Sequence, residues 1–290
     1  MATKNEVAEV KSTAAMNYDY GESKHEGFED TKITDLSIPF ISVMQSNSQL
    51  VEDEDHPAKS GDLVNSVTGE VVPQPIILQP IHKDHLWAEW TPRSKGGGRG
   101  DSHEDGSDIV KKILDANGGS RIPPENADGQ RMPFKTPDGM DLIETHYVYC
   151  LILDETGSES IGYCVLPFSS TKIKVQKDWW TSMYTIKGSP PLIANRVRVS
   201  TTKQTAKGKT FYNLSIRPFA ETWIKSLINP GDEAGMSLLT GAREFREMIE
   251  GGLAKAATET EGKVSDTNER DSGKSQTDDQ STGSDDEIPF

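Results

Sequence analysis

The sequence predicts a mainly β domain with a few helices, flanked at both ends by acidic segments that lack a hydrophobic core. Apolar runs of strand length recur between turn residues in the middle of the chain, and a few stretches have helical spacing. The ends show neither pattern. Only 33% of the 290 residues are hydrophobic and 27% are charged, which indicates that part of the chain stays outside any core.

These patterns divide the chain into three parts. We expect a disordered acidic arm over residues 1–30, a folded domain over 31–257 and a disordered acidic tail over 258–290. The sequence has no apolar run long enough for a membrane helix and no apolar signal core near its beginning. Two cysteines are too few for a disulfide framework. A cytoplasmic, reducing location fits these features.

The first half of the domain alternates strand signals with irregular segments. An apolar cluster within 33–50 predicts a short docked helix, and valines around a Thr-Gly turn predict a hairpin over 63–72. Residues 76–81 and 86–90 predict two strands joined by a tight connection. The glycine-rich segment 93–108 predicts a mobile loop, because glycines do not hold one conformation.

The second half gives the clearest signals. Its predicted elements are a strand hairpin over 147–153 and 161–168, a helix over 169–184, a second hairpin over 192–200 and 210–217, a helical stretch over 220–228 and a helix beginning at Asp232. An OB-type barrel also places a helix between its third and fourth strands, and it commonly binds single-stranded nucleic acid. Because the chain has more strand candidates than the five of that barrel, we expect an elaborated OB-like barrel.

Charge is distributed unevenly along the chain. The formal net charge is -15, yet residues 161–228 hold eleven Lys and Arg against two Asp and Glu. Residues 259–290 hold ten acidic residues against three basic ones. A basic middle inside an acidic chain is typical of a protein with one surface that meets phosphate and a tail that avoids it.

Aromatic residues are interleaved with the cations, as binding of a single strand requires. Nine of the twenty aromatic residues lie between 163 and 223, although each ring has the alternative of a place in the core. The candidate DNA-binding residues are Trp90, Arg93, Lys95, Arg99, Lys172, Lys174, Arg196, Arg198, Lys203, Lys207, Lys209, Phe211 and Tyr212.

Strand geometry refines two of these predictions. Arg196 and Arg198 are two positions apart, so both project from one face about 7 Å from each other, close to the phosphate spacing. An ordinary solvated strand face is the alternative. Phe211 and Tyr212 must face opposite sides, and we expect Tyr212 on the outer face because its hydroxyl tolerates water.

The last six residues carry a further signal, Asp285, Asp286, Glu287, Ile288, Pro289 and Phe290. Proline stiffens the backbone, the ring fits a small apolar pocket, and a basic rim on a partner pairs with the carboxylates. This peptide resembles the C-terminal tip of bacterial single-stranded DNA-binding proteins, which typically reads Asp-Asp-Asp-Ile-Pro-Phe. Glu287 replaces one Asp and keeps the charge. The alternative is an acidic solubilising tail that ends in Phe.

The sequence gives little support for catalysis or for a cofactor. His82, His85, Cys150 and Cys164 offer nitrogen and sulfur ligands for zinc, but no Cys-x₂-Cys pair is present. The two cysteines are also typical of buried small residues in strands. Common hydrolase, metalloprotease and phosphate-loop motifs are missing, so we do not expect an enzyme.

Together with the resemblance, these features predict a phage-encoded single-stranded DNA-binding protein of replication, recombination and repair. Its domain coats single strands without strong sequence preference, and its acidic tip recruits partner proteins. One alternative is an adaptor that uses the tip to target host replication factors without binding DNA. Another is an inhibitor that mimics DNA, although its acids should then lie on the folded domain rather than at the ends.

Overall fold

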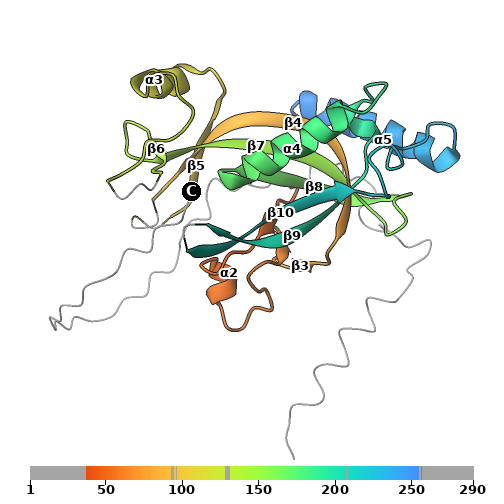
Figure 1. Ribbon diagram of the computed structural model, residues 1–290, viewed down its shortest axis with the longest axis horizontal. Helices are drawn as coiled ribbons and strands as arrows, with labels where there is room; N and C mark the ends of the chain where they lie inside the picture. The colour runs from red at the N-terminus through yellow and green to blue at the C-terminus, as the bar shows by residue number, and fades with distance from the viewer. Residues whose placement is uncertain are drawn as a thin grey trace, which may run out of the picture. The chain divides into compact units, whose positions relative to one another are not determined.

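A computed structural model describes residues 37–256, except Arg93, Ser94, Gly96, 128–130, Lys207 and Lys255, and omits the side chains of Ala206 and Lys209 (Figure 1). The strands are β1 (Ile41–Val43), β2 (Leu63–Asn65), β3 (Val71–Val72), β4 (Ile76–Trp90), β5 (Arg99–Glu104), β6 (Phe134–Lys135), β7 (Asp141–Leu153), β8 (Ser160–Ser169), β9 (Val197–Ala206) and β10 (Lys209–Pro218). The helices are α2 (Gln49–Glu52), α3 (Asp108–Ala116), α4 (Thr171–Tyr184) and α5 (Glu233–Glu250), with a 3₁₀ turn at Leu192–Ala194. The predicted class, β with helices, is confirmed.

Seven strands form one antiparallel sheet around the long ribbon of β4 and β7. At one end of the ribbon, β9 pairs with the start of β4 and β8 pairs with β7, which gives the order β10-β9-β4-β7-β8. At the other end, β5 pairs with β4 and β6 pairs with β7. The ribbon therefore carries two different sets of neighbours along its length.

The predicted pair of strands at 76–81 and 86–90 is one continuous strand. β4 runs through both, with a register shift between Pro80 and His82 where it pairs with β7. A bulge suits this place because proline has no N–H to donate to the ladder. The charged residues between the two predicted strands continue the extended backbone, because β7 offers a partner along the whole length.

The prediction of a helix within 33–50 is largely wrong. Residues 41–43 form β1, which pairs with β2, and only the short α2 follows. The segment also contacts both outer strands of the order given above: Phe40 bridges Val165 on β8, and the Gln45 amide exchanges two hydrogen bonds with the Tyr212 backbone on β10. Among the described residues β8 and β10 do not pair directly, so main-chain pairing does not close a barrel.

The main core lies between the sheet and α4. Trp179 and Met183 of α4 pack with Leu166 and Phe168 of β8 and with residues of β4, β7, β9 and β10. The helix begins and ends close to its predicted bounds, because its apolar positions recur at helical spacing. The predicted hairpin of β7 and β8 is also confirmed.

A second, smaller core holds the long connection between β4 and β7. Trp87, Val110, Phe134 and Leu142 are buried together, so that α3 and β6 are anchored to the far end of the ribbon. The glycine-rich segment 93–108 was predicted as a mobile loop, and this prediction is wrong for its second part. Residues 99–104 form β5, a polar edge strand whose side chains are mostly exposed and which is specified by its backbone pairing with β4.

The C-terminal part of the domain ends in α5. Asp232 caps this helix by accepting a hydrogen bond from the Gly235 amide, as expected for an Asp at this position. The predicted helical stretch over 220–228 forms turns instead, and no α-helix is assigned there. None of the helices in the described part of the chain is long and apolar enough to cross a membrane.

Candidate nucleic-acid interface

Three of the residues predicted to contact DNA lie near the end of the β4–β7 ribbon. Trp90 is the last residue of β4 and keeps 38% of its surface exposed. Its register partner is Arg99 on β5, whose guanidinium carbon lies 5.5 Å from the centre of the Tyr147 ring. Lys95 is exposed in the connection between these strands. Arg93, the fourth residue predicted in this place, lies outside the described residues.

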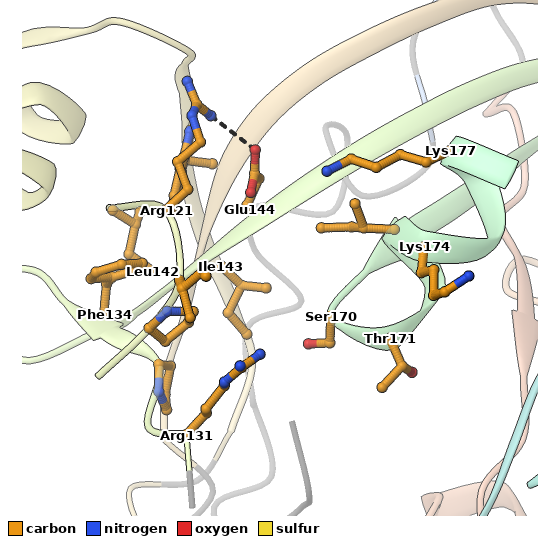
Figure 2. A pocket seen from close by; sticks show the side chains of 15 residues that line it. Arg121, Arg131, Phe134, Leu142, Ile143, Glu144, Ser170, Thr171, Lys174 and Lys177 are labelled. Carbon is orange, nitrogen blue, oxygen red and sulfur yellow. Dashed lines mark hydrogen bonds and ion pairs between the residues drawn. The ribbon is translucent and has the colours of Figure 1, made fainter. Parts of the chain in front are cut away.

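A pocket of about 470 Å³ lies beside this region, between the first turns of α4 and the segment that leads into β6 (Figure 2). Its apolar walls are formed by Trp87, Ile122, Pro123, Pro133, Phe134, Leu142, Ile143 and Ile173. Its cations are Arg121, Arg131, Lys174 and Lys177. The lining contains a single carboxylate, that of Glu144. Apolar walls with a cationic rim can hold a flat ring and a phosphate together.

Helix α4 contributes lysines to this region, and two of them line the pocket. Lys174 forms an ion pair with Asp178 at 2.7 Å, whereas Lys177 extends across the pocket toward Glu144 in Figure 2. Lys172 does not line the pocket. It is half-buried, and burial lowers the pKa of its ammonium group. The structure thus favours Lys174 and Lys177 over Lys172 for contact with phosphate.

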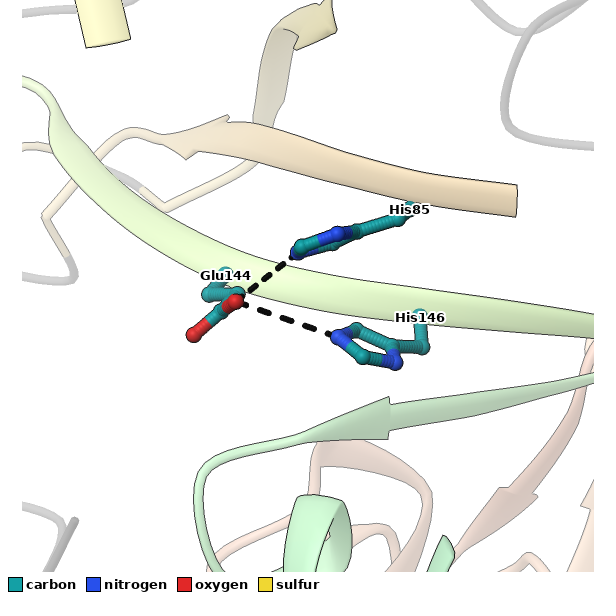
Figure 3. Close-up of side chains that lie close together, drawn as sticks. All are labelled: His85, Glu144 and His146. Atoms are coloured by element: carbon teal, nitrogen blue, oxygen red, sulfur yellow. Dashed lines mark hydrogen bonds and ion pairs between the residues drawn. The ribbon is translucent and has the colours of Figure 1, made fainter. Parts of the chain in front are cut away.

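The Glu144 carboxylate lies beside two histidines (Figure 3) and is paired with Arg121 (Figure 2). Its Oε1 accepts a hydrogen bond from Arg121 Nη1 at 2.9 Å and lies 2.8 Å from His85 Nε2 and 3.8 Å from His146 Nε2. Burial alone would raise the pKa of Glu144, but the neighbouring His146 and the hydrogen bonds with His85 and Arg121 lower it to about 2. The carboxylate is therefore ionised at neutral pH, and Arg121, which it shares with Asp105, is its charged partner.

Asp105 extends the same cluster to the end of β5. It accepts hydrogen bonds from Arg121 Nη2 at 2.7 and 2.9 Å and from Trp87 Nε1 at 3.1 Å. Burial alone would raise the pKa of Asp105, and the hydrogen bonds from Trp87 and Arg121 lower it. Burial and the neighbouring His146 lower the pKa of His85. None of these residues belongs to the DNA-binding set that the sequence predicted.

Arg196 departs from its predicted role. It is half-buried, and burial lowers the pKa of its guanidinium. The guanidinium donates to the carbonyl oxygens of Gly157 at 2.9 Å, Ser226 at 3.3 Å and Leu227 at 3.3 Å. These carbonyl oxygens lie in turns, outside the hydrogen-bond ladders of the sheet, and Arg196 donates to them instead. Arg196 therefore ties the turns to the sheet rather than presenting its donors to a ligand.

Arg198 has the exposed position that the sequence predicted. Val197 and Val199 are buried on the opposite face, and the Arg198 guanidinium carbon lies 5.2 Å from the centre of the Phe219 ring. Its register partner on β10 is Arg217, also exposed. Within the described residues neither arginine has a carboxylate within 4.0 Å. Like charges directly opposite each other destabilise a sheet, and a bound anion removes that repulsion.

In the β9–β10 hairpin, Tyr212 does not lie on the outer face, as the sequence predicted. Lys203 is exposed, and its register partner is Tyr212. The Tyr212 ring lies on the core side with Leu214, against Gly61, where an added Cβ would approach Tyr212 Cε1 to 2.6 Å. Strand alternation therefore places Phe211 on the outer face. Hydroxyl polarity was a poor guide because the ring packs beside the core.

Several predicted residues lie outside the described part of the chain. They are Lys207, the side chain of Lys209, the arm over 1–30, the tail over 258–290 and its docking peptide Asp285, Asp286, Glu287, Ile288, Pro289 and Phe290. Their predicted roles remain predictions.

The structure does not assemble the zinc ligands that the sequence offered. Cys150 and Cys164 are register partners, both fully buried with free thiols, and burial raises the pKa of Cys150. Among the described residues the close group of ligand-type side chains is His85, Glu144 and His146. It contains neither cysteine and does not contain His82.

The described domain is rich in β-strands and presents cations at the pocket and exposed arginines on the β9–β10 hairpin. A family model described as Pam3 phage gp34-like protein matches residues 5–255, so the chain belongs to the Pam3 phage gp34-like family. This membership confirms the predicted bacteriophage origin. No curated protein and no solved structure matches the chain.

Proposed function

We propose that this protein binds single-stranded DNA during phage replication, recombination and repair and recruits partner proteins through its C-terminal tip. Binding proceeds without strong sequence preference, because the available contacts are to phosphates and to the flat faces of bases. The protein performs no chemistry on the strand. It coats the strand in the host cytoplasm and requires no cofactor for coating.

One observation carries the proposal: the pocket between α4 and the ribbon combines apolar walls with four cations and a carboxylate that is already paired. A nucleotide has the complementary chemistry, with an apolar ring and an anionic phosphate. Glu144 does not repel the phosphate strongly, because Arg121 and His85 hold its charge. Lys174 lies in the first turn of α4, where the helix dipole also favours an anion, and Lys177 lies one turn further along the helix.

The strand order supports an OB-like barrel as the binding domain. Strands β4, β7, β8, β9 and β10 pair in the order β10-β9-β4-β7-β8, and α4 lies between β8 and β9 in the chain. An OB-fold has a three-strand meander, a helix and a hairpin that returns to its first strand, and here β9 returns to β4. Segment 38–45 occupies the place where the barrel strands would otherwise close.

A second cationic site supports the same function. Arg198 and Arg217 project from neighbouring strands without carboxylate partners among the described residues, and the Phe219 ring lies beside Arg198. Two arginines opposite each other match two successive phosphates of a flexible strand. Phe211 on the outer face and Trp90 supply rings for stacking.

The acidic tip supplies the second half of the function. Its three carboxylates and Ile-Pro-Phe resemble the partner-docking peptide of bacterial single-stranded DNA-binding proteins. Without DNA, the acidic tail competes for the basic surface of the domain through charge complementarity. DNA binding then releases the tip for polymerase, primase, helicase or nuclease partners.

The test is a fluorescence anisotropy titration of labelled oligo-dT, duplex DNA and single-stranded RNA with the full-length protein at two salt concentrations. Tight, salt-sensitive binding to oligo-dT with weak binding to duplex is the expected result. The Lys174→Gln, Lys177→Gln double variant should bind more weakly, whereas a Lys111→Gln, Lys112→Gln control on α3, which removes the same charge, should not. If the full-length protein and a tail-deleted protein bind none of the three, the adaptor function replaces DNA binding.

A further inference from the structure

Three side chains with metal-ligand chemistry converge on one face of the β4–β7 ribbon, outside the cations assigned to DNA. His85 and His146 are register partners on the two strands, and their ring centres lie 4.2 Å apart. Glu144 is two positions before His146 on the same face. The potential ligand atoms of the three residues all lie within 4.8 Å of one another (Figure 3).

The distances fit a shared ion with small side-chain adjustments. Ligands about 2.1 Å from a tetrahedral zinc ion lie about 3.4 Å from one another. Glu144 Oε1 is 2.8 Å from His85 Nε2 and 3.8 Å from His146 Nε2, which brackets that spacing. The two histidines and Glu144 are half-buried or buried, so few waters compete for the ion.

The surroundings of His85 match those of a metal ligand. Its Nε2 faces Glu144, and its Nδ1 lies 3.6 Å from the Asp105 carboxylate. A ligating histidine usually directs its second ring nitrogen to a carboxylate or carbonyl, which fixes the ring and raises its basicity. Asp105 is itself fixed by Trp87 and Arg121. A second carboxylate is thus in place behind the ligand before any ion binds.

Arg121 is the group that an ion would displace. It donates to Glu144 through Nη1 and to Asp105 through Nη2, and 43% of its side chain is exposed. Because Asp105 already holds Nη2, the guanidinium can release Glu144 without losing its anchor. The exchange replaces one cation beside Glu144 by another of higher charge, and the ligands remain on rigid strands.

We propose that His85, Glu144 and His146 bind one divalent transition-metal ion of the zinc class. Two imidazoles and one carboxylate favour zinc, cobalt, nickel, manganese or ferrous iron over calcium and magnesium, which prefer oxygen ligands alone. Three protein ligands leave a coordination position for water or for an anionic ligand. Since Glu144 lines the pocket, the ion adds positive charge to the pocket wall.

The test uses full-length protein without an affinity tag, stripped with a chelator. Titration with Co²⁺ is followed by visible absorption, and titration with Zn²⁺ by calorimetry. We expect one ion per chain, with the absorption of a low-coordinate cobalt site, and a rise in melting temperature on metal addition. A His85→Gln, His146→Gln variant should lose at least 100-fold in affinity. The control is His103→Gln, because His103 on β5 contacts Glu89 of β4 at 2.7 Å, outside the cluster.

Two outcomes of these titrations overturn the proposal. One is a stripped wild-type protein that binds neither ion. The other is a stoichiometry and affinity that the His85→Gln, His146→Gln variant retains, since the ion would then lie elsewhere. If that variant does not fold, Asp105→Asn keeps all three ligands and should weaken cobalt binding about 10- to 100-fold through loss of ligand orientation. Unchanged binding in a folded Asp105→Asn protein would also contradict the proposal.

Discussion

The pair formed by Arg198 and Arg217 gives the most quantitative prediction. Both arginines are replaced by glutamine, which removes two charges and keeps side chains of similar length and polarity. In the structure the two residues are register partners, both exposed, and within the described residues neither has a carboxylate at ion-pair distance. Each is therefore free to neutralise one phosphate.

Counterion release sets the magnitude. Each phosphate neutralised on a single strand contributes about 0.7 to the slope of log K against log salt. Loss of both arginines should reduce that slope by about 1.4. At about 0.1 M salt each contact is worth about fivefold in affinity relative to about 1 M, so the double variant should bind about 25-fold more weakly.

The assay is anisotropy of labelled oligo-dT across a series of salt concentrations, with full-length wild type and variant. The control is Arg243→Gln, Arg246→Gln on α5, which removes the same charge from a different element. An unchanged slope in the Arg198→Gln, Arg217→Gln protein would refute the assignment of these arginines to phosphate. If the slope falls by the same amount in the control, the effect comes from net charge alone.

Three further predictions concern the tail, pH and the core. Deletion of residues 285–290 should tighten oligo-dT binding at low salt, because the acidic tip competes with DNA. An equal or weaker affinity, measured by anisotropy, would contradict this competition. Asp154 has a pKa lowered to about 2 because, although burial opposes the shift, the Thr156 hydroxyl and the backbone amides of Thr156, Ser158 and Glu159 donate to its carboxylate. Its contribution of about 1 kcal/mol is therefore present above pH 4 and lost as pH falls toward 2, and urea unfolding of Asp154→Asn should lack this loss. In the same assay, Leu166→Ala, at a fully buried position, should lower the free energy of unfolding by about 3 kcal/mol. Ile161→Ala, at an exposed position, should lower it by under about 1 kcal/mol, and equal losses would show that Leu166 is not part of the core.

Local patterns were sufficient for several elements. The apolar runs of β7 and β8 with a short turn between them predicted the hairpin. The spacing of Leu238, Ala242, Phe245, Ile249 and Leu253 predicted the last helix, and the first four of these residues form the buried face of α5, whereas Leu253 follows the helix and is exposed. Alternation also placed Val197 and Val199 inside and Arg198 outside. In each case neighbours within a few positions determine the structure.

Features set by distant pairing were not predictable. β5 is polar and becomes a strand only because β4 offers an edge, and β1 becomes a strand because β2 and β8 flank it. His85 and Glu144 are 59 positions apart and meet through the register of β4 against β7. Arg196 looked like Arg198 in sequence, and only the turn carbonyls around it reveal its different role.

Photochemical crosslinking tests the central proposal most directly. Oligo-dT substituted with bromodeoxyuridine is irradiated with the full-length protein, and crosslinked peptides are identified by mass spectrometry. We expect crosslinks in peptides that contain Trp90, Phe211 or the first turns of α4, and we expect them to disappear at high salt. Crosslinks confined to α5 and α3, or none at all under conditions where a known single-strand binder reacts, would contradict binding of DNA at this surface.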